Sequence, residues 1–283
     1  MKTIAGIQSM KLWTRRQRAA GQKIAFVPTM GFLHEGHLSL LRRARREADS
    51  VVMSVFVNPL QFGPGEDYER YPRDTKKDRR LASREACDVF FTPSVGDLYP
   101  TGFRTVVSVG GFEDVLCGAS RPGHFVGVAT VVLKLLNVVQ PHVLLLGQKD
   151  AQQAIAIGRM LRDLDMDVRL IVCPTVREPD GLAMSSRNNY LSPDERRRAA
   201  AIYRTLLLGK RLIREGGARP GTVVSRMKAA LRESGITRID YVSIVSVEDL
   251  APAKALKGNL LVAVAARVGK ARLIDNIEVR ART

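Results

Sequence analysis

The feature that most constrains the fold is an alternation of short apolar runs with segments of helical periodicity. Residues 24–27 form an apolar run, residues 38–48 carry apolar side chains every three or four positions, and residues 51–57 are rich in Val. This order predicts a βαβ unit. Because strands that are buried on both faces and joined by crossover helices are typical of parallel sheets, we predict an α/β fold built on a doubly wound parallel sheet.

The alternation continues through the first part of the chain. Strands are predicted over 89–92, 105–109, 142–146 and 168–172, and helices over 126–139 and 151–163. Turn-forming residues at 174–181 then interrupt the alternation of strands and helices and predict a loop. We therefore place a domain boundary there and predict a first domain of residues 1–176.

The second part, residues 177–283, is predicted to be a smaller α+β domain. A capping signature with Pro at the first helical position, residues 192–195, opens a long Arg-rich helix that reaches about residue 215. The elements predicted after it are a helix over 222–233 and strands over 239–245, 260–268 and 273–279.

The charge of the chain raises the question of a nucleic-acid partner. Lys and Arg number 45 against 28 Asp and Glu, a formal net charge of +17. The basic residues, 33 of them Arg, are spread along the chain, and with aromatic residues at 6% no basic segment is interleaved with stacking rings. We therefore predict no specific nucleic-acid binding and interpret the arginines as solvated helix faces.

The sequence also bears on compartment and redox state. No apolar run approaches the roughly 18 to 20 residues of a membrane span, and the N-terminus lacks the apolar stretch of a signal peptide, so we expect a cytoplasmic protein without membrane contact. Cys87, Cys117 and Cys173 lie far apart and form no CxxC pair. They are predicted to be buried thiols, neither disulfides nor zinc ligands.

The most informative stretch follows the strand predicted at 24–27. His34 and His37 are three positions apart and therefore share one face of the helix that begins there. At a helix start, unpaired N–H groups and the helix dipole favour phosphate, and two imidazoles could donate hydrogen bonds to it in a phosphoryl or nucleotidyl transfer. Gly36 would allow close approach of a nucleotide. The alternative is a pair of surface histidines, and the spacing does not match a zinc protease.

Two further polar stretches could join this site. The segment 147–153 follows a predicted strand at the edge where ligands bind in doubly wound sheets, and its Lys149 could contact phosphates. Its alternative interpretation is a turn in which Asp150 caps the next helix. The segment 183–189 offers hydroxyls and the Arg187 guanidinium on a loop that could close over an anionic group, although alone it could equally be a polar surface loop.

Together these stretches resemble a known family. Met30 through His37 is similar to the His-x-Gly-His signature of the nucleotidyltransferase superfamily that includes class I aminoacyl-tRNA synthetases, and 184–187 to its shortened second signature. Residues 56–62, 121–125 and 147–153 narrow the resemblance to the pantoate–β-alanine ligase family, and 266–276 is also family-like. The match runs from about residue 24 to the C-terminus.

The resemblance implies a Rossmann-like first domain, a smaller domain that closes over the site, a homodimer, and ATP and Mg²⁺ as co-substrate and metal. It implies that pantoate and ATP form a pantoyl adenylate, which the amine of β-alanine then attacks to release pantothenate and AMP. The catalytic residues implied are His37 as acid, His34 as its phosphate-side partner, Lys149 and Arg187. The ATP-binding residues implied are Met30, Gly31, Phe32, Leu33, His34, Glu35, Gly36, His37, Gly147, Gln148, Lys149, Asp150, Val176, Met184, Ser185, Ser186 and Arg187.

For the remaining ligands, the resemblance implies that Gln61 and Gln153 bind pantoate, that Asn58 helps to orient it, and that Asp78 contacts magnesium. The chain departs from the family at Phe32, where a small residue is usual, and at Leu146, where Phe is usual. Two other functions remain open on the sequence: a different nucleotidyltransferase that releases a nucleotide-linked product, and an RNA-binding protein on a synthetase-like fold.

Overall fold

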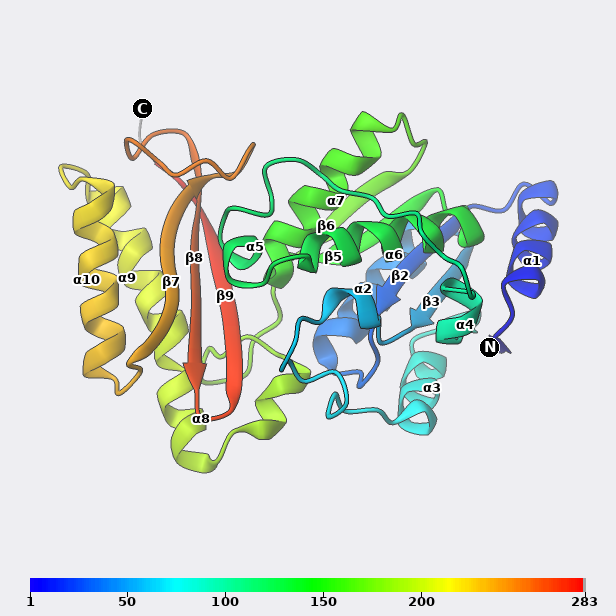
Figure 1. The fold of residues 1–283 in the computed structure, drawn as a ribbon, viewed down its shortest axis with the longest axis horizontal. Coiled ribbons are helices and arrows are strands. Elements are labelled where there is room, and N and C mark those ends of the chain that lie inside the picture. Colours follow the sequence, from blue (N-terminus) through cyan, green and yellow to red (C-terminus); the bar gives the residue numbers. More distant parts are fainter. Residues whose placement is uncertain (282–283) are drawn as a thin grey trace. The chain divides into compact units, whose positions relative to one another are not determined.

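The computed structural model describes residues 1–281 (Figure 1), and they form two compact units. The first consists of Met1–Glu113, Arg121–Gly147 and Ala156–Pro174. The second consists of Asp114–Ser120, Gln148–Ile155 and the chain from Thr175 onward. The main boundary between the two units therefore lies between residues 174 and 175. Two short segments that precede this boundary in the sequence, 114–120 and 148–155, also belong to the second unit.

The first unit contains a six-stranded sheet in the order β1-β4-β3-β2-β5-β6, in which every strand pair is parallel. The chain runs outward from β2 on one side and from β5 on the other, which is the doubly wound arrangement predicted from the sequence. The strands are β1 (Lys2–Ile4), β2 (Ile24–Thr29), β3 (Ser50–Val55), β4 (Val89–Phe91), β5 (Val143–Gly147) and β6 (Arg169–Cys173).

Helices flank this sheet because each carries an apolar face. One side of the sheet packs in a single buried cluster with α2 and α3, including Val27, Leu41 and Leu145, all fully buried. The helices that belong to this unit in whole or in part are α1 (Ile7–Ala19), α2 (Glu35–Glu47), α3 (Thr75–Arg84), α4 (Val95–Leu98), α6 (His124–Val139) and α7 (Ala151–Asp163), with a 3₁₀ turn, η1, at Pro59–Gln61.

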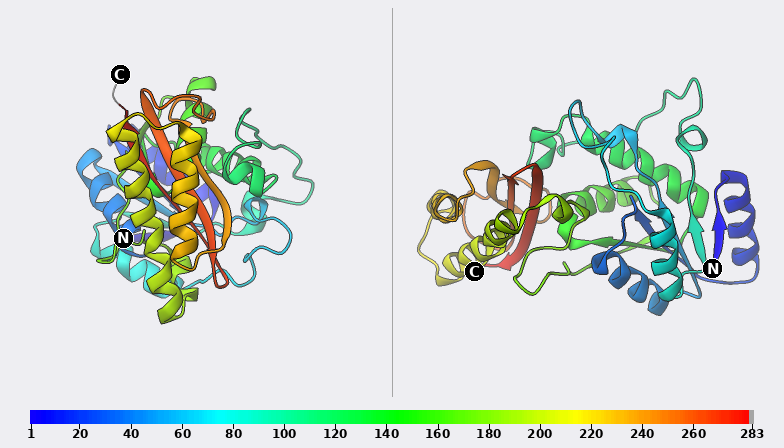
Figure 2. Two further views of the ribbon diagram at one scale, coloured as in Figure 1. Left: turned by 90° about the vertical axis from the view of Figure 1, so that its left-hand side faces the viewer. Right: turned by 90° about the horizontal axis from the view of Figure 1, so that it is seen from below.

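The second unit is a three-stranded antiparallel sheet, β7 (Arg238–Ser246), β8 (Asn259–Val268) and β9 (Ala271–Arg280), covered by helices. Figures 1 and 2 show α9 (Ala201–Glu215) and α10 (Pro220–Glu233) lying along one side of these strands. Gly209 permits this packing, since a Cβ there would lie 2.6 Å from the Met227 sulfur. The remaining elements are α5 (Cys117–Ser120), η2 (Gln148–Asp150), η3 (Ser186–Tyr190) and α8 (Pro193–Ala199).

Two predictions about single elements were wrong, and some elements were not predicted. Residues 105–109 form no strand; Val106 is 57% exposed there, and Val107 N–H donates to the Thr130 hydroxyl instead of to a neighbouring strand. The long helix predicted to reach residue 215 is two helices, α8 and α9, that meet at Ala200. The sequence analysis also missed β1, α1 and α3. The three cysteines are buried free thiols, as predicted.

None of the helices between residues 1 and 281 combines the length and apolar character required to cross a bilayer.

Candidate functional site

The first predicted ATP segment, Met30–His37, consists of the loop between β2 and α2 and the first residues of α2, at the carboxyl edge of the parallel sheet. Its backbone is unusual, because Gly31 (φ 85°) and Phe32 (φ 52°) are both left-handed. A Cβ on Gly31 would lie 2.8 Å from Val55 Cγ1 and 2.9 Å from an Asp78 carboxylate oxygen. Only glycine fits there without a shift of its neighbours.

Asp78, on α3, accepts hydrogen bonds from this loop. Its two carboxylate oxygens accept from the backbone N–H groups of Phe32 (2.8 Å) and Leu33 (2.7 Å), and the residue is 1% exposed. Burial raises the pKa of Asp78, although the two N–H donors act to lower it.

The role predicted for Asp78 was a contact to magnesium. The carboxylate is almost fully buried, each of its oxygens accepts one backbone N–H, and residues 1–281 contain no group of three or more His, Cys, Asp or Glu side chains that could hold a metal ion. The magnesium assignment of Asp78 therefore finds no support in the structure.

His34 and His37 cap the start of α2 reciprocally. The Gly36 N–H donates to His34 Nδ1 (3.2 Å), and the His34 N–H donates to His37 Nδ1 (3.3 Å). The rings lie 4.1 Å apart between centroids. The start of α2 was predicted to offer unpaired backbone N–H groups to a ligand. Two N–H groups at this helix start donate instead to the side chains of its own histidines. Because an accepting Nδ1 cannot carry a proton, the neutral imidazoles carry theirs on Nε2.

Gln61, predicted to bind the acid substrate, is the last residue of η1, and Asn58, predicted to orient that substrate, is the N-cap of η1. Asn58 is 1% exposed; its Oδ1 accepts from the Tyr99 hydroxyl (2.8 Å), and its Nδ2 donates to the Gly127 carbonyl (3.0 Å) and to Gln61 Oε1 (3.2 Å). Gln61 Nε2 in turn contacts Met30 Sδ at 2.9 Å. Two of the predicted acid-binding residues, Asn58 and Gln61, therefore adjoin the predicted nucleotide segment in this unit.

A second network holds the Gln61 backbone. Arg121 Nη2 (3.1 Å) and His124 Nδ1 (2.8 Å) both reach the Gln61 carbonyl, and Arg121 forms a two-point ion pair with Glu66. Burial alone would raise the pKa of Glu66, but the hydrogen bonds and charge of Arg121 outweigh it and lower that pKa. The only sequence signal was the family-like stretch 121–125.

In the second unit, η2 follows β5 and carries Gln148, Lys149 and Asp150. Lys149 Nζ lies 3.4 Å from the Asp150 carboxylate, which is half exposed. Asp150 ends the 3₁₀ turn and directly precedes α7, which is the position of the helix cap that the alternative interpretation assigned to it. Asn276 on β9 donates to the Gln148 (3.0 Å) and Lys149 (2.9 Å) carbonyls, an interaction that sequence reasoning also missed. Gln153 lies on the first turn of α7 and is partly buried.

The structure brings Val176 together with the loop that holds the second signature. The Met184 N–H donates to the Val176 carbonyl at 3.0 Å, and Arg177 and Ala183 form a bridge beside them. Ser185 caps η3 by accepting from the Arg187 N–H (3.3 Å). Val176 and Met184 to Arg187 therefore form one local structure.

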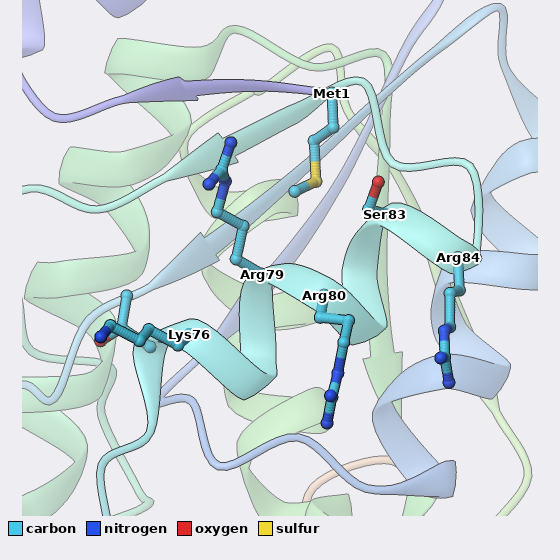
Figure 3. A pocket seen from close by; sticks show the side chains of 7 residues that line it. Met1, Lys76, Arg79, Arg80, Ser83 and Arg84 are labelled. Atoms are coloured by element: carbon cyan, nitrogen blue, oxygen red, sulfur yellow. The ribbon is translucent and has the colours of Figure 1, made fainter.

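Figure 3 shows a surface hollow on α3 that contains none of these residues. It has a cavity volume of about 500 Å³ and contains several cationic side chains but no carboxylate and no histidine. The residues that line it are Met1, Thr75, Lys76, Arg79, Arg80, Ser83 and Arg84.

Comparison with known proteins gives the family. The family described as "Pantoate-beta-alanine ligase" matches residues 2–278. The chain belongs to this family. A pantothenate synthetase of Thermotoga neapolitana is 54% identical over 98% of this chain and 99% of its own, and one of Caldicellulosiruptor saccharolyticus is 50% identical over 99% of both.

Solved structures of the ligase family agree with the fold. Pantothenate synthetase from Thermus thermophilus is 47% identical, with a TM-score of 0.93 over 99% of this chain and 100% of its own. The pantoate-beta-alanine ligase of Francisella tularensis, complexed with beta-gamma ATP and beta-alanine, is 35% identical, with a TM-score of 0.82 over 98% of this chain and 97% of its own. Family membership decides between the two enzyme functions considered above in favour of the ATP-dependent ligase.

Proposed function

We propose that this chain condenses pantoate with β-alanine in two steps at the expense of ATP. In the first step, a pantoate carboxylate oxygen attacks the α-phosphorus of ATP, which forms pantoyl adenylate and releases pyrophosphate. In the second step, the amine of β-alanine attacks the acyl carbon, loses a proton and releases AMP and pantothenate. Adenylation is required because a carboxylate is a poor acylating agent until it carries a good leaving group.

The observation that carries the proposal is the reciprocal capping of His34 and His37. With each Nδ1 accepting a backbone N–H, each neutral ring carries its proton on Nε2 and can donate a hydrogen bond from that atom. Two donors held at a helix start can stabilise the negative charge that builds on the phosphates during adenylation without reorganising. We assign the role of acid to His37 and the phosphate contact to His34.

The acid substrate is assigned to Gln61 and Gln153, with Asn58 as the residue that orients it. The Asn58 amide holds Gln61 Oε1, and the Arg121 network holds the Gln61 backbone, so the Gln61 side chain is placed before substrate arrives. Neutral amides can bind the hydroxyls and carboxylate of pantoate without a fixed counter-ion, which would weaken the carboxylate as a nucleophile.

We assign the nucleotide to Met30–His37, Gly147–Asp150, Val176 and Met184–Arg187, with Lys149 and Arg187 as the cationic contacts to the phosphates. These two side chains would offset charge on the triphosphate and the departing pyrophosphate. We assign magnesium to the phosphates of ATP, since Mg²⁺ in nucleotide sites is usually bound by substrate phosphates together with only one or two carboxylates.

A homodimer, a cytoplasmic location and the lack of specific nucleic-acid binding remain predictions. Analytical ultracentrifugation tests the first, and RNA retention over a salt series tests the last, since binding that vanishes at physiological salt reflects only the +17 charge.

The proposed reaction is tested by measuring AMP release with pantoate and β-alanine each omitted in turn. We expect AMP at a steady rate only when both are present. Steady AMP release without β-alanine, or a product that retains the nucleotide, would refute the amide-forming reaction.

A further inference from the structure

Asp78 is a buried carboxylate whose hydrogen bonds lie within the nucleotide loop and not toward a ligand. The residue is 1% exposed, and its two oxygens accept from two consecutive backbone N–H groups, those of Phe32 and Leu33. Consecutive N–H groups in a turn that includes left-handed residues form an anion-binding concavity. In this chain the anion is supplied by the protein itself.

The loop needs such a partner because its backbone is strained. Phe32 has φ 52°, in a region that a bulky side chain occupies only at an energetic cost. The cost persists in a folded protein only where surrounding contacts outweigh it. Helix α3 makes two contacts with Phe32: the Asp78 carboxylate holds its N–H, and Lys77 Nζ lies 5.4 Å from the centroid of its ring.

The carboxylate is itself placed by a regular element. Asp78 lies in the first turn of α3, and Asp74 caps that helix by accepting from the Lys77 N–H at 2.9 Å. The loop residue that follows Leu33 is His34, the N-cap of α2. A shift of the Leu33 amide would therefore be passed directly to the two imidazoles.

We propose that Asp78 is a positioning residue that holds Met30–His37 in the conformation that binds ATP, and that it does not coordinate magnesium. The proposal rests on the proposed function, because it assigns Asp78 a role in adenylation. It also accounts for the bulky Phe32 at a position where the family usually has a small residue. The hydrogen bond from the Phe32 N–H to Asp78 stabilises a left-handed backbone conformation that a bulky side chain disfavours.

The first experiment compares wild type with Asp78→Asn in pantoate-dependent pyrophosphate–ATP exchange. An Asn side chain has one oxygen and cannot accept both N–H groups, so we expect exchange to fall about 10- to 100-fold, the cost of one charge-assisted hydrogen bond. The Mg²⁺ concentration for half-maximal exchange, measured at fixed ATP, should stay unchanged. A several-fold rise in that concentration would overturn the proposal in favour of a metal ligand.

Asp74→Ala is the matched control, since it removes the cap of α3 but leaves the Asp78 carboxylate in place. We expect a lower Tm with exchange retained at a temperature well below unfolding. Loss of exchange as large as in Asp78→Asn would show that α3 stability, and not the carboxylate, governs activity, and would overturn the proposal.

A double-mutant cycle with Phe32→Gly tests the strain directly. Glycine adopts a positive φ at little cost, so the loss caused by Asp78→Asn should be smaller in the Phe32→Gly background than in wild type. An equal loss in both backgrounds would contradict the proposal. Failure of wild type to catalyse exchange at all would instead refute the proposed function, so the two failures are distinguishable.

Discussion

Asn276 and Gln148 form two hydrogen bonds with each other, and each residue is the donor in one of them. Asn276 Nδ2 donates to the Gln148 carbonyl at 3.0 Å, and Gln148 Nε2 donates to Asn276 Oδ1 at 3.1 Å. Asn276 Nδ2 also reaches the Lys149 carbonyl, and its neighbour Asp275 is 4% exposed in a two-point ion pair with Arg177. The family-like stretch 266–276 therefore ends in two residues that hold the Lys149 loop and the residue after Val176.

The first prediction concerns Asn276. Replacing it by Ala removes three hydrogen bonds around η2, so Lys149 should lose its fixed position and the KM for ATP should rise about tenfold or more. Initial-rate kinetics with varied ATP measure this effect. Asn137→Ala, at an exposed position on α6, is the control and should leave the KM unchanged. An unchanged KM in Asn276→Ala would show that the loop keeps its geometry without these bonds.

The second prediction is a pH dependence of stability through Glu66. Its pKa is lowered in the folded protein because Arg121 outweighs the effect of burial, so its stabilising contribution is present above the unfolded pKa of about 4.3 and is lost as pH falls through the folded value. Glu66→Gln should therefore cost about 1–3 kcal/mol near pH 7 and progressively less below about pH 4. Urea unfolding across pH measures the difference.

Glu69→Gln, an exposed change in the same loop, is the control for the loss of one charge. A Glu66→Gln deficit of the same size at pH 3 and pH 7 would contradict a role for the ionised carboxylate.

The sheet was predictable because its strands are buried on both faces, which leaves contiguous apolar runs such as Ile24–Val27, all fully buried. Helix α3 was missed because its face toward the core consists of little more than Asp78 and Ala82, too few apolar positions to show a period. The apolar run at 105–109 misled the analysis because burial, and not composition, determines whether a strand forms.

For the candidate site, the sequence predicted the residue types that could carry the chemistry better than the contacts that hold them in place. Motif similarity named His34, His37, Gln61 and Lys149 as candidates, since these residue types can carry the chemistry. It named Asp78 only as a magnesium contact and Asn276 only within a family-like stretch, and it did not predict the loops that they hold, because those contacts join positions 45 or more residues apart and leave no local spacing to read. The tautomer of the histidines likewise depends on hydrogen bonds that only the folded loop defines.

The third prediction separates the acid site from the nucleotide site. Gln61→Ala should weaken pantoate binding by about 1–3 kcal/mol for each buried hydrogen bond that is lost, and Gln153→Ala should act likewise. The affinity for ATP alone should change little. Calorimetric titration with each ligand tests this, with Gln8→Ala, an exposed change on α1, as the control. An equal loss of ATP affinity would mean that these amides do not belong to the acid site.

The fourth prediction concerns the order of the steps. β-Alanine has nothing activated to attack until pantoyl adenylate exists, so pantoate-dependent exchange of labelled pyrophosphate into ATP should proceed without it. His37→Ala and Lys149→Ala should each slow that exchange about 100- to 1,000-fold, the usual effect of removing one preorganised donor to developing charge.

The second step provides the internal control for these two variants. When pantoyl adenylate is supplied, no charge develops on a triphosphate, so amide formation with β-alanine should be slowed much less than exchange. A variant that was merely misfolded would lose both activities together. Exchange that requires β-alanine would rule out the sequential mechanism. Normal exchange in His37→Ala would contradict the role assigned to the start of α2. In that case the proton on His37 Nε2, whose tautomer is fixed by the contact between the His34 N–H and His37 Nδ1, would not contribute to binding the phosphates.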